Sequence, residues 1–219
     1  MDWILANIPL IGQLTLDHVR LSVIPILVGF LVATPLGWVA HRWKWSRGIL
    51  LGVVGLLYTI PSLALFMILT PLLGLSVLSE ANVLIALSLY AVAIMVRSAA
   101  DAFSSIEPRA LRAATAVGYG EWGRFFAVEL PLAGPVLLAG IRVVAVSTVS
   151  LVTVGVLVGV SSLGYFFTDG FQRRIVPEVL AGVVMTFLVA LFFDGLLVLA
   201  GRWIMPWASL ATASRGRET

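Results

Sequence analysis

Residues 21–40 read LSVIPILVGFLVATPLGWVA, a run of 20 positions without a charged side chain. A helix of about 20 apolar residues is long enough to cross the hydrocarbon core of a bilayer. The segment that follows, residues 41–47, mixes basic side chains with Trp43 and Trp45. Basic and aromatic side chains together are typical of a membrane–water interface. The stretch therefore predicts a membrane-spanning helix that ends near residue 40.

Four more apolar stretches follow along the chain. They cover residues 48–79 (with Pro71 and Gly74 expected to end the helix), 81–103, 131–160 and 178–201. The five stretches predict an all-α fold, a polytopic bundle of about five membrane-spanning helices in a single domain of residues 1–219. Residues 1–18 are expected to form an interfacial segment. Their uncharged part, from Trp3 to Leu16, is shorter than the about 20 residues that a span needs.

The composition excludes several classes of protein. Hydrophobic residues make up 60% of the chain and charged residues 11%, whereas soluble domains carry about 25% charged residues. A net charge of +3 gives no indication of nucleic-acid binding. There is no cysteine and no GxxxxGKS or GxxxxGKT motif for nucleotide phosphates, and His18 and His41 stand alone. We therefore expect this chain to bind no metal, cofactor or nucleic acid and to hold no catalytic residue.

The basic residues are unevenly divided between the two sides of the predicted bundle. One side receives nine of them, at positions 42, 44, 47, 109, 112, 124, 202, 215 and 217. The other side receives Arg20, Arg173 and Arg174. Cytoplasmic segments of membrane proteins carry an excess of Lys and Arg. This pattern predicts that residues 104–130 and the C-terminus are cytoplasmic and that the N-terminus lies outside.

The longest polar segment, residues 104–131, reads SSIEPRALRAATAVGYGEWGRFFAVELP. Pro108 suits the first turn of a helix, residues 109–117 are rich in helix formers, and Gly118 supplies a stop. A second short helix is expected over residues 121–130. The segment thus predicts a helix–turn–helix on the cytoplasmic side.

Three aromatic residues of this second helix, Trp122, Phe125 and Phe126, fall on one face at helical spacing. Two interpretations follow from the residues alone. The segment either lies on the bilayer or its own bundle, or it presents a docking surface.

The spacing within this segment resembles the EAA loop of ABC importer permeases. That loop has Glu-Ala-Ala, a Gly four residues later, and Leu-Pro twelve and thirteen residues after the Gly. The matching positions in this chain are Ala113, Ala114, Gly118, Leu130 and Pro131, with Arg112 where the family has Glu. The resemblance implies the fold of a type I importer. It also implies that these residues belong to a coupling helix that sits in a cleft of an ATPase subunit.

Four other stretches resemble the permeases for osmoprotectants such as glycine betaine, carnitine, choline and proline. They are residues 58–66, 89–97, 139–142 and 162–170. This resemblance implies a transmembrane subunit of an ATP-driven importer in the bacterial cytoplasmic membrane, embedded in lipid. The implied partners are ABC ATPase subunits that bind the ATP, a second permease copy or paralogue, and an extracytoplasmic solute-binding protein.

Two charged residues, Arg142 and Asp194, interrupt the last two apolar stretches. A charge within the hydrocarbon is costly unless it is paired, and the two residues fall at similar depth. We expect them to pair with each other, or each with another partner, inside the bundle, either to fix the register of the helices or as part of a gate. Arg97 and Asp101, four residues apart on one helix, are expected to pair locally.

Polar residues and a proline in the other stretches are candidates for the translocation path. They are Thr59, Pro61, Ser62, Tyr90, Ser147 and Thr148. A proline within a span frees a backbone carbonyl, and discontinuous helices often line transport paths. The alternatives are a kink that only shapes packing and hydroxyls that join helices. An aromatic site for a quaternary ammonium group has the candidates Tyr58, Tyr90, Trp38 and Phe66.

Three other functions stay open at this level. The chain is alternatively a permease of the same superfamily for another small solute, such as methionine or an oxyanion. A membrane-embedded enzyme would need convergent catalytic groups, which the pattern does not contain. A structural or channel-forming protein would leave the spacing within residues 104–131 without a function.

Overall fold

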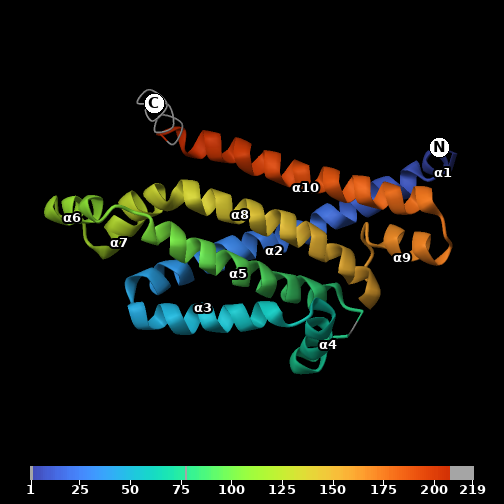
Figure 1. Cartoon of the computed structure of the whole chain (residues 1–219), viewed down its shortest axis with the longest axis horizontal. Coiled ribbons are helices and arrows are strands. Elements are labelled where there is room, and N and C mark those ends of the chain that lie inside the picture. Colours follow the sequence, from blue (N-terminus) through green and yellow to red (C-terminus); the bar gives the residue numbers. More distant parts are fainter. Residues whose placement is uncertain (1, 77, 208–219) are drawn as a thin grey trace.

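The chain forms a bundle of helices that run mostly along the long axis of the molecule (Figure 1). This computed structural model describes residues 2–76 and 78–207, and within these ranges it holds helices and no strand. Four long helices are apolar enough to cross a membrane: α2 (Ile8–Arg42), α5 (Glu80–Ser104), the continuous stretch Glu121–Val158 that contains α8 (Leu130–Val152), and α10 (Val176–Ile204). The predicted all-α membrane bundle is confirmed.

The first long helix begins earlier than the sequence predicts. Residues 8–18 continue without a break into the first apolar stretch as α2, preceded only by the short helix α1 (Asp2–Ala6). Leu14 and His18 of α2 are buried, and the His18 Nε2 lies 2.9 Å from the Val149 carbonyl oxygen of α8. Residues 8–18 are therefore part of the first long helix and not a separate segment. The interfacial position expected for residues 1–18 stays a prediction.

A seam of small residues joins α2 to α5 at the centre of the bundle. A Cβ atom added to Gly29 would lie 2.7 Å from the Cβ atom of Ala91, and Gly37 meets Ala99 in the same way. Small residues at such contacts let two helix backbones approach closely. The seam holds α2 and α5 side by side in a common direction, as Figure 1 shows.

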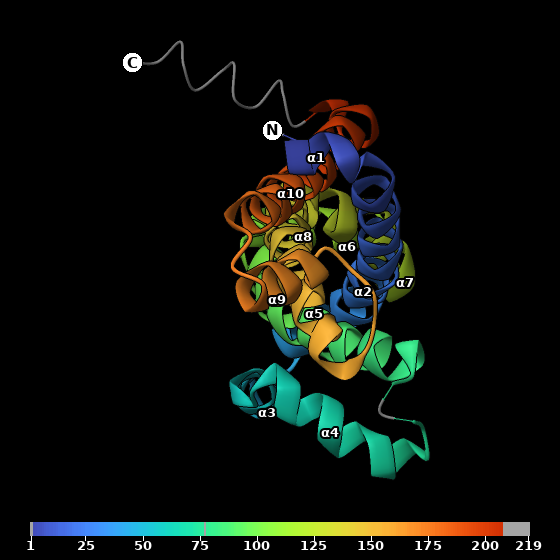
Figure 2. The ribbon, with the colours of Figure 1, turned by 90° about the vertical axis from the view of Figure 1, so that its right-hand side faces the viewer.

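The second apolar stretch, expected as one helix ended by Pro71 and Gly74, is broken into two helices. α3 (Lys44–Thr59) and α4 (Ser62–Leu73) meet at 103°. Pro71 lies inside α4, and the helix ends at Gly74, as predicted, with φ +66°. The cause is Pro61, since a residue before proline is driven from the helical into the extended region, and Ile60 has φ −65° and ψ 126°. Figure 2 shows the two helices below the rest of the bundle. Counting this bent pair as one span gives five.

The end of α8 also differs from prediction. The helix does not continue to residue 160. It ends at Val152, and a 3-10 helix, η2 (Thr153–Val158), leads to Gly159 with φ +80°. A short helix, α9 (Tyr165–Gln172), then precedes α10.

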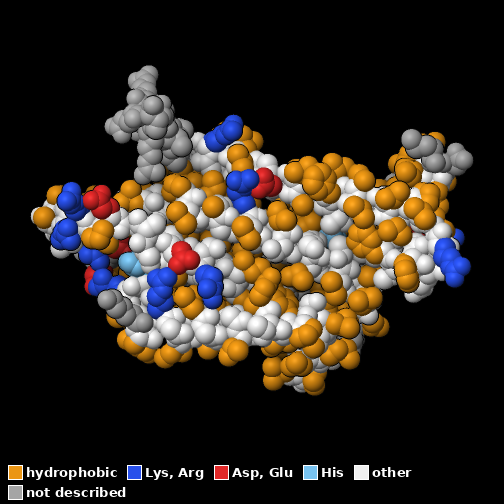
Figure 3. All heavy atoms as spheres, in the orientation of Figure 1, with side chains coloured by type: hydrophobic (Ala, Val, Ile, Leu, Met, Phe, Trp, Pro, Cys, Tyr) orange, Lys and Arg blue, Asp and Glu red, His pale blue; other side chains and the backbone are white. Residues whose placement is uncertain are grey.

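The two ends of the described chain lie at opposite ends of the long axis. α1 and the start of α10 lie at one end in Figure 1, and the last turn of α10 lies at the other. This arrangement matches an odd number of passes along that axis. Hydrophobic side chains cover much of the surface in Figure 3, and charged side chains gather mainly toward the two ends. Arg215 and Arg217, which entered the charge count above, lie outside the described residues.

Candidate functional site

The predicted helix–turn–helix forms one end of the molecule. It consists of α6 (Pro108–Ala116) and α7 (Glu121–Arg124), and Gly118 between them has φ +98°. A side chain at such a positive φ would be strained, which explains the glycine. Figure 1 places α6 and α7 at the extreme end of the bundle, beyond the start of α8.

The residues with the EAA spacing do not share one environment. Arg112, Ala113 and Gly118 are exposed, whereas Ala114 is buried against the bundle. Arg112 takes part in none of the ion pairs among the described residues. Leu130 and Pro131 are half-buried at the start of α8. The exposed residues of the EAA spacing thus lie on α6 and in the turn after it, and the Leu-Pro pair lies where the segment joins the membrane helix.

The second short helix differs from prediction, because it runs directly into α8. α7 ends at Arg124 and continues through a π-helix, η1 (Phe125–Glu129), into Leu130. The three aromatic residues are consequently split. Trp122 and Phe126 are exposed, whereas Phe125 is buried, with ring centroids 5.1 Å from Trp38 and 5.9 Å from Phe103.

A buried carboxylate that sequence reasoning missed lies at the end of η1. The Glu129 side chain accepts a hydrogen bond of 2.6 Å from Nε1 of Trp38 and one of 2.7 Å from Nε of Arg124. The Nη1 of Arg124 donates in turn to the Thr115 hydroxyl at 3.1 Å. These four residues, defined here as the Glu129 network, join α6, α7 and η1 to α2. The available signal was a carboxylate placed immediately before the Leu-Pro start of an apolar stretch.

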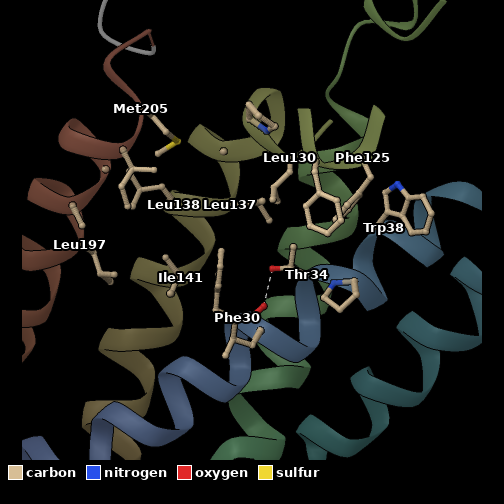
Figure 4. Close-up of a pocket in the computed structure, with 18 of the residues that line it drawn as sticks. Phe30, Thr34, Trp38, Phe125, Leu130, Leu137, Leu138, Ile141, Leu197 and Met205 are labelled. Carbon is tan, nitrogen blue, oxygen red and sulfur yellow. Dashed lines mark hydrogen bonds between the residues drawn. The ribbon is translucent and has the colours of Figure 1, made fainter. Parts of the chain in front are cut away.

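An apolar groove of about 780 Å³ lies beside this network, between α2, α8 and α10. Figure 4 shows Phe30, Trp38, Phe125, Leu138 and Leu197 around it. Its one hydroxyl, that of Thr34, donates to the Phe30 carbonyl at 2.7 Å. A site for a charged solute needs convergent polar groups, and this groove offers none. The groove is therefore not a candidate for the solute site.

The intramembrane pair predicted from the sequence forms. Arg142 of α8 donates from Nε and Nη2 to the two carboxylate oxygens of Asp194 of α10, at 2.6 and 2.8 Å. Such a two-bond geometry fixes the relative rotation of the two helices. The side chains are 42% and 28% exposed, so the pair lies at the surface of this chain and not inside the bundle. That corrects the expected location.

The α3/α4 break collects four of the six residues proposed for a path. Thr59, Pro61 and Ser62 form the break itself, and the Tyr90 hydroxyl of α5 donates to the carbonyl of Ile60. Tyr90 is 3% exposed, so its side chain is buried beside the break. Ser147 and Thr148 lie on α8 instead, where Thr148 is buried.

The aromatic candidates do not form one cage. Tyr58 and Tyr90 contact edge to face, with centroids 5.9 Å apart. Trp38 instead packs on Phe125 of η1 and tilts against Trp122 of α7. Phe66 is fully buried. A cation–π site from all four residues is therefore not present.

The expected local pair of Arg97 and Asp101 does not form. Asp101 accepts a hydrogen bond of 2.8 Å from Arg47 of α3 instead, and this ion pair ties α3 to α5. A partner on a neighbouring helix was closer than the one on the same helix, which a helical spacing rule does not reveal.

Acidic side chains gather at the opposite end of the molecule, around α9. Asp169 accepts a hydrogen bond of 3.1 Å from Arg173, and Glu178 at the start of α10 is buried. Burial raises the pKa of the Tyr165 hydroxyl, and the negative charges of Asp169 and Glu178 raise it further.

The fold is that of a membrane-embedded helix bundle with a polar helix–turn–helix at one end. The family model for the "binding-protein-dependent transport system inner membrane component" matches residues 22–206. The chain belongs to this family, and it is accordingly a multi-pass protein of the inner membrane.

Curated relatives and solved structures agree with this assignment. The chain is 30% identical to the choline transport system permease protein OpuBB of Bacillus subtilis, over 88% of this chain and 87% of that one. It is 31% identical to the osmoprotectant import permease protein OsmW of Salmonella typhimurium, over 90% and 93%. Its fold is similar to a chain of the inward-facing MetNI methionine ABC transporter, with a TM-score of 0.73, 19% identity and coverage of 92% and 97%.

Proposed function

We propose that this chain is the transmembrane subunit of an ATP-driven importer for a compatible solute that carries a quaternary ammonium group, such as choline, glycine betaine or carnitine. Proline, an osmoprotectant without a quaternary ammonium group, is included in the proposed class of compatible solutes. The names of the two relatives above support this class, since one transports choline and the other imports osmoprotectants. Methionine, the solute in the name of the structural neighbour, is the alternative that uptake assays must separate.

The observation that carries the proposal is the exposed surface of α6 and its turn. Ala113 and Gly118 are small and exposed at the tip of the molecule, so they leave room for a partner's close approach. We infer that ABC ATPase subunits dock there and that they bind and hydrolyse the ATP. This chain then needs no cofactor of its own.

The remaining partners follow from the same proposal. A second permease, either another copy or a paralogue, encloses the path, and an extracytoplasmic binding protein delivers the solute at the α9 end. The end with α6 and α7 carries Arg42, Arg47, Arg109, Arg112, Arg124 and Arg202, whereas the other end carries Arg20, Arg173 and Arg174. This excess supports a cytoplasmic α6 end and an external N-terminus.

The docking surface is tested with substitutions that the structure allows. Ala113→Trp adds bulk at an exposed position without internal contacts, whereas Ala114 and Gly118 are poor test sites because one is buried and the other has positive φ. The matched control is Phe171→Ala, at an 82% exposed position on α9. Co-purification with co-expressed ATPase subunits should fail for the tryptophan variant alone. Equal recovery of all three chains contradicts docking on α6.

The solute class is tested by uptake into proteoliposomes that hold the assembled transporter and ATP. Labelled choline, glycine betaine, carnitine, proline and methionine are compared, each with the binding protein present. We expect uptake of at least one quaternary ammonium solute and none of methionine. Uptake of methionine alone reassigns the solute and leaves the ATP-driven mechanism in place.

A further inference from the structure

The Glu129 network has a buried centre and one exposed member, Thr115, and the proposed docking surface does not by itself explain the buried part. Its central carboxylate is 4% exposed, and its arginine is 17% exposed. Each carboxylate oxygen has its own donor, and the two donors come from different helices, Trp38 of α2 and Arg124 of α7. The fourth member, Thr115, lies on α6, which carries the proposed docking surface.

Stability alone gives no reason for such an arrangement. A buried ion pair must overcome the desolvation of both charges, and well-packed apolar residues are often as stable or more so. Hydrogen bonds between fixed donors and acceptors are directional, however, so they define one relative position of the helices. The network is therefore suited to holding α6, α7 and α2 in a single geometry.

The backbone around Glu129 supports the same interpretation. The N–H of Leu130 donates to the carbonyl of Phe125, which is the wide turn of a π-helix. Such turns are rare and occur frequently at functional sites, because the contacts around them must hold them in place. Phe125 supplies that contact here by packing on Trp38, the same residue that donates to Glu129. Polar and apolar contacts thus converge on one side chain of α2.

We propose that Trp38, Arg124 and Glu129 are positioning residues that make α2 follow α6 when the ATPase subunits move it. The proposal rests on the proposed function, since it requires ATPase subunits docked on α6. A displacement of α6 passes through Thr115 and Arg124 to Glu129, and from Glu129 to Trp38. Loss of the network leaves ATP hydrolysis intact but separates it from the movement of the membrane helices.

Two variants alter the network without leaving a lone buried charge. Arg124→Met combined with Glu129→Leu replaces the ion pair by apolar side chains, a change that buried pairs often tolerate. Trp38→Phe keeps an aromatic ring against Phe125, although a smaller one, and removes the N–H donor to Glu129, which keeps its bond to Arg124. The control is Glu121→Gln, which breaks the exposed pair of Glu121 with Arg42, another link between α7 and α2.

Each variant is assembled with its ATPase and binding-protein partners in proteoliposomes, and two rates are measured in the same vesicles. These are ATP hydrolysis and uptake of labelled choline and glycine betaine. For the double variant and Trp38→Phe, we expect hydrolysis close to wild type and uptake per ATP lowered about tenfold, the scale of one lost charge-assisted hydrogen bond. The control should keep both rates.

The combined triple variant should lower uptake per ATP no further than the double variant, since residues of one network are not additive. Should the double variant fail to elute as a single folded species, Trp38→Phe carries the test alone. A proportional fall of both rates indicates a purely structural role and overturns the proposal, as does unchanged uptake per ATP. A wild-type chain that recruits no ATPase overturns this proposal together with the proposed function, whereas the two preceding results overturn this proposal alone.

Discussion

Two arginine–carboxylate pairs involve the α8 region, and they differ in their surroundings. The Arg124–Glu129 pair before the helix is almost fully buried and has two further partners, Trp38 and Thr115. The Arg142–Asp194 pair in its middle is partly exposed, and its two bonds are to each other. The first pair therefore connects four helices (α2, α6, α7 and η1), whereas the second connects only α8 and α10. Burial decides how much each pair loses when one charge is removed.

The largest expected effect is that of Glu129→Leu alone. Removing one partner of a buried pair leaves an uncompensated charge, which costs about 3 kcal/mol or more. Arg124 and the Trp38 N–H would both lose their acceptor. Thermal unfolding of the detergent-purified chain should show a lower Tm for this variant than for Arg124→Met with Glu129→Leu. Equal Tm values for the single and double variants would show that a lone buried charge at this pair costs no stability.

Substitutions in the Arg142–Asp194 pair should destabilise the chain less than Glu129→Leu does. Exchanging the two residues should restore much of the loss. Arg142→Leu and Asp194→Leu each leave one charge on a membrane-spanning helix, so both lower the yield of monodisperse protein. The exchange Arg142→Asp with Asp194→Arg restores an opposite-charge pair and should recover much of that yield. If the exchanged protein gives no higher yield than the two single variants, the yield depends on where each charge lies and not on their pairing.

Loss of the neutral hydrogen bond at the α3/α4 break should destabilise the chain less than loss of either ion pair. Tyr90→Phe removes the donor to the Ile60 carbonyl and should destabilise the chain by about 1 kcal/mol. Tyr58→Phe is the matched control, because Tyr58 contributes a ring contact to Tyr90 and none of the hydrogen bonds at the break. If Tyr58→Phe lowers the Tm more than Tyr90→Phe does, ring packing and not the hydrogen bond stabilises the break.

The smallest effect belongs to the exposed pair of Arg42 and Glu121. Glu121→Gln should change stability by less than about 1 kcal/mol, since exposed ion pairs contribute little. Added salt should reduce even this difference. A Tm change as large as that of Glu129→Leu would show that exposure does not separate these pairs.

The sequence predicted the membrane bundle because hydrocarbon thickness imposes a length on every span, and that length is visible in the runs of apolar residues. It also predicted the partnership of Arg142 and Asp194, since few charges lie within those runs. At Pro61 it left two outcomes open, a discontinuous helix and a kink that only shapes packing. The surrounding run is uniformly apolar, so composition does not predict the size of the bend, which is 103°.

The Glu129 network was out of reach for a different reason. Its donors lie at positions 38 and 124, and only the packing of η1 against α2 brings them to one carboxylate. The start of α2 was missed because residues 3–16 are too short for a span by themselves, yet they extend a helix that is already long enough. Local patterns predict elements well, whereas contacts between distant segments depend on how the helices pack.

The seam between α2 and α5 also fixes which parts of the two helices meet. Gly29 and Gly37 meet Ala91 and Ala99 at the same interval along both helices, so the two helices run in the same direction and in one register. Trp38 follows Gly37, and Tyr90 precedes Ala91. The seam therefore places the helix that contacts η1 through Trp38 directly against the helix that contacts the α3/α4 break through Tyr90.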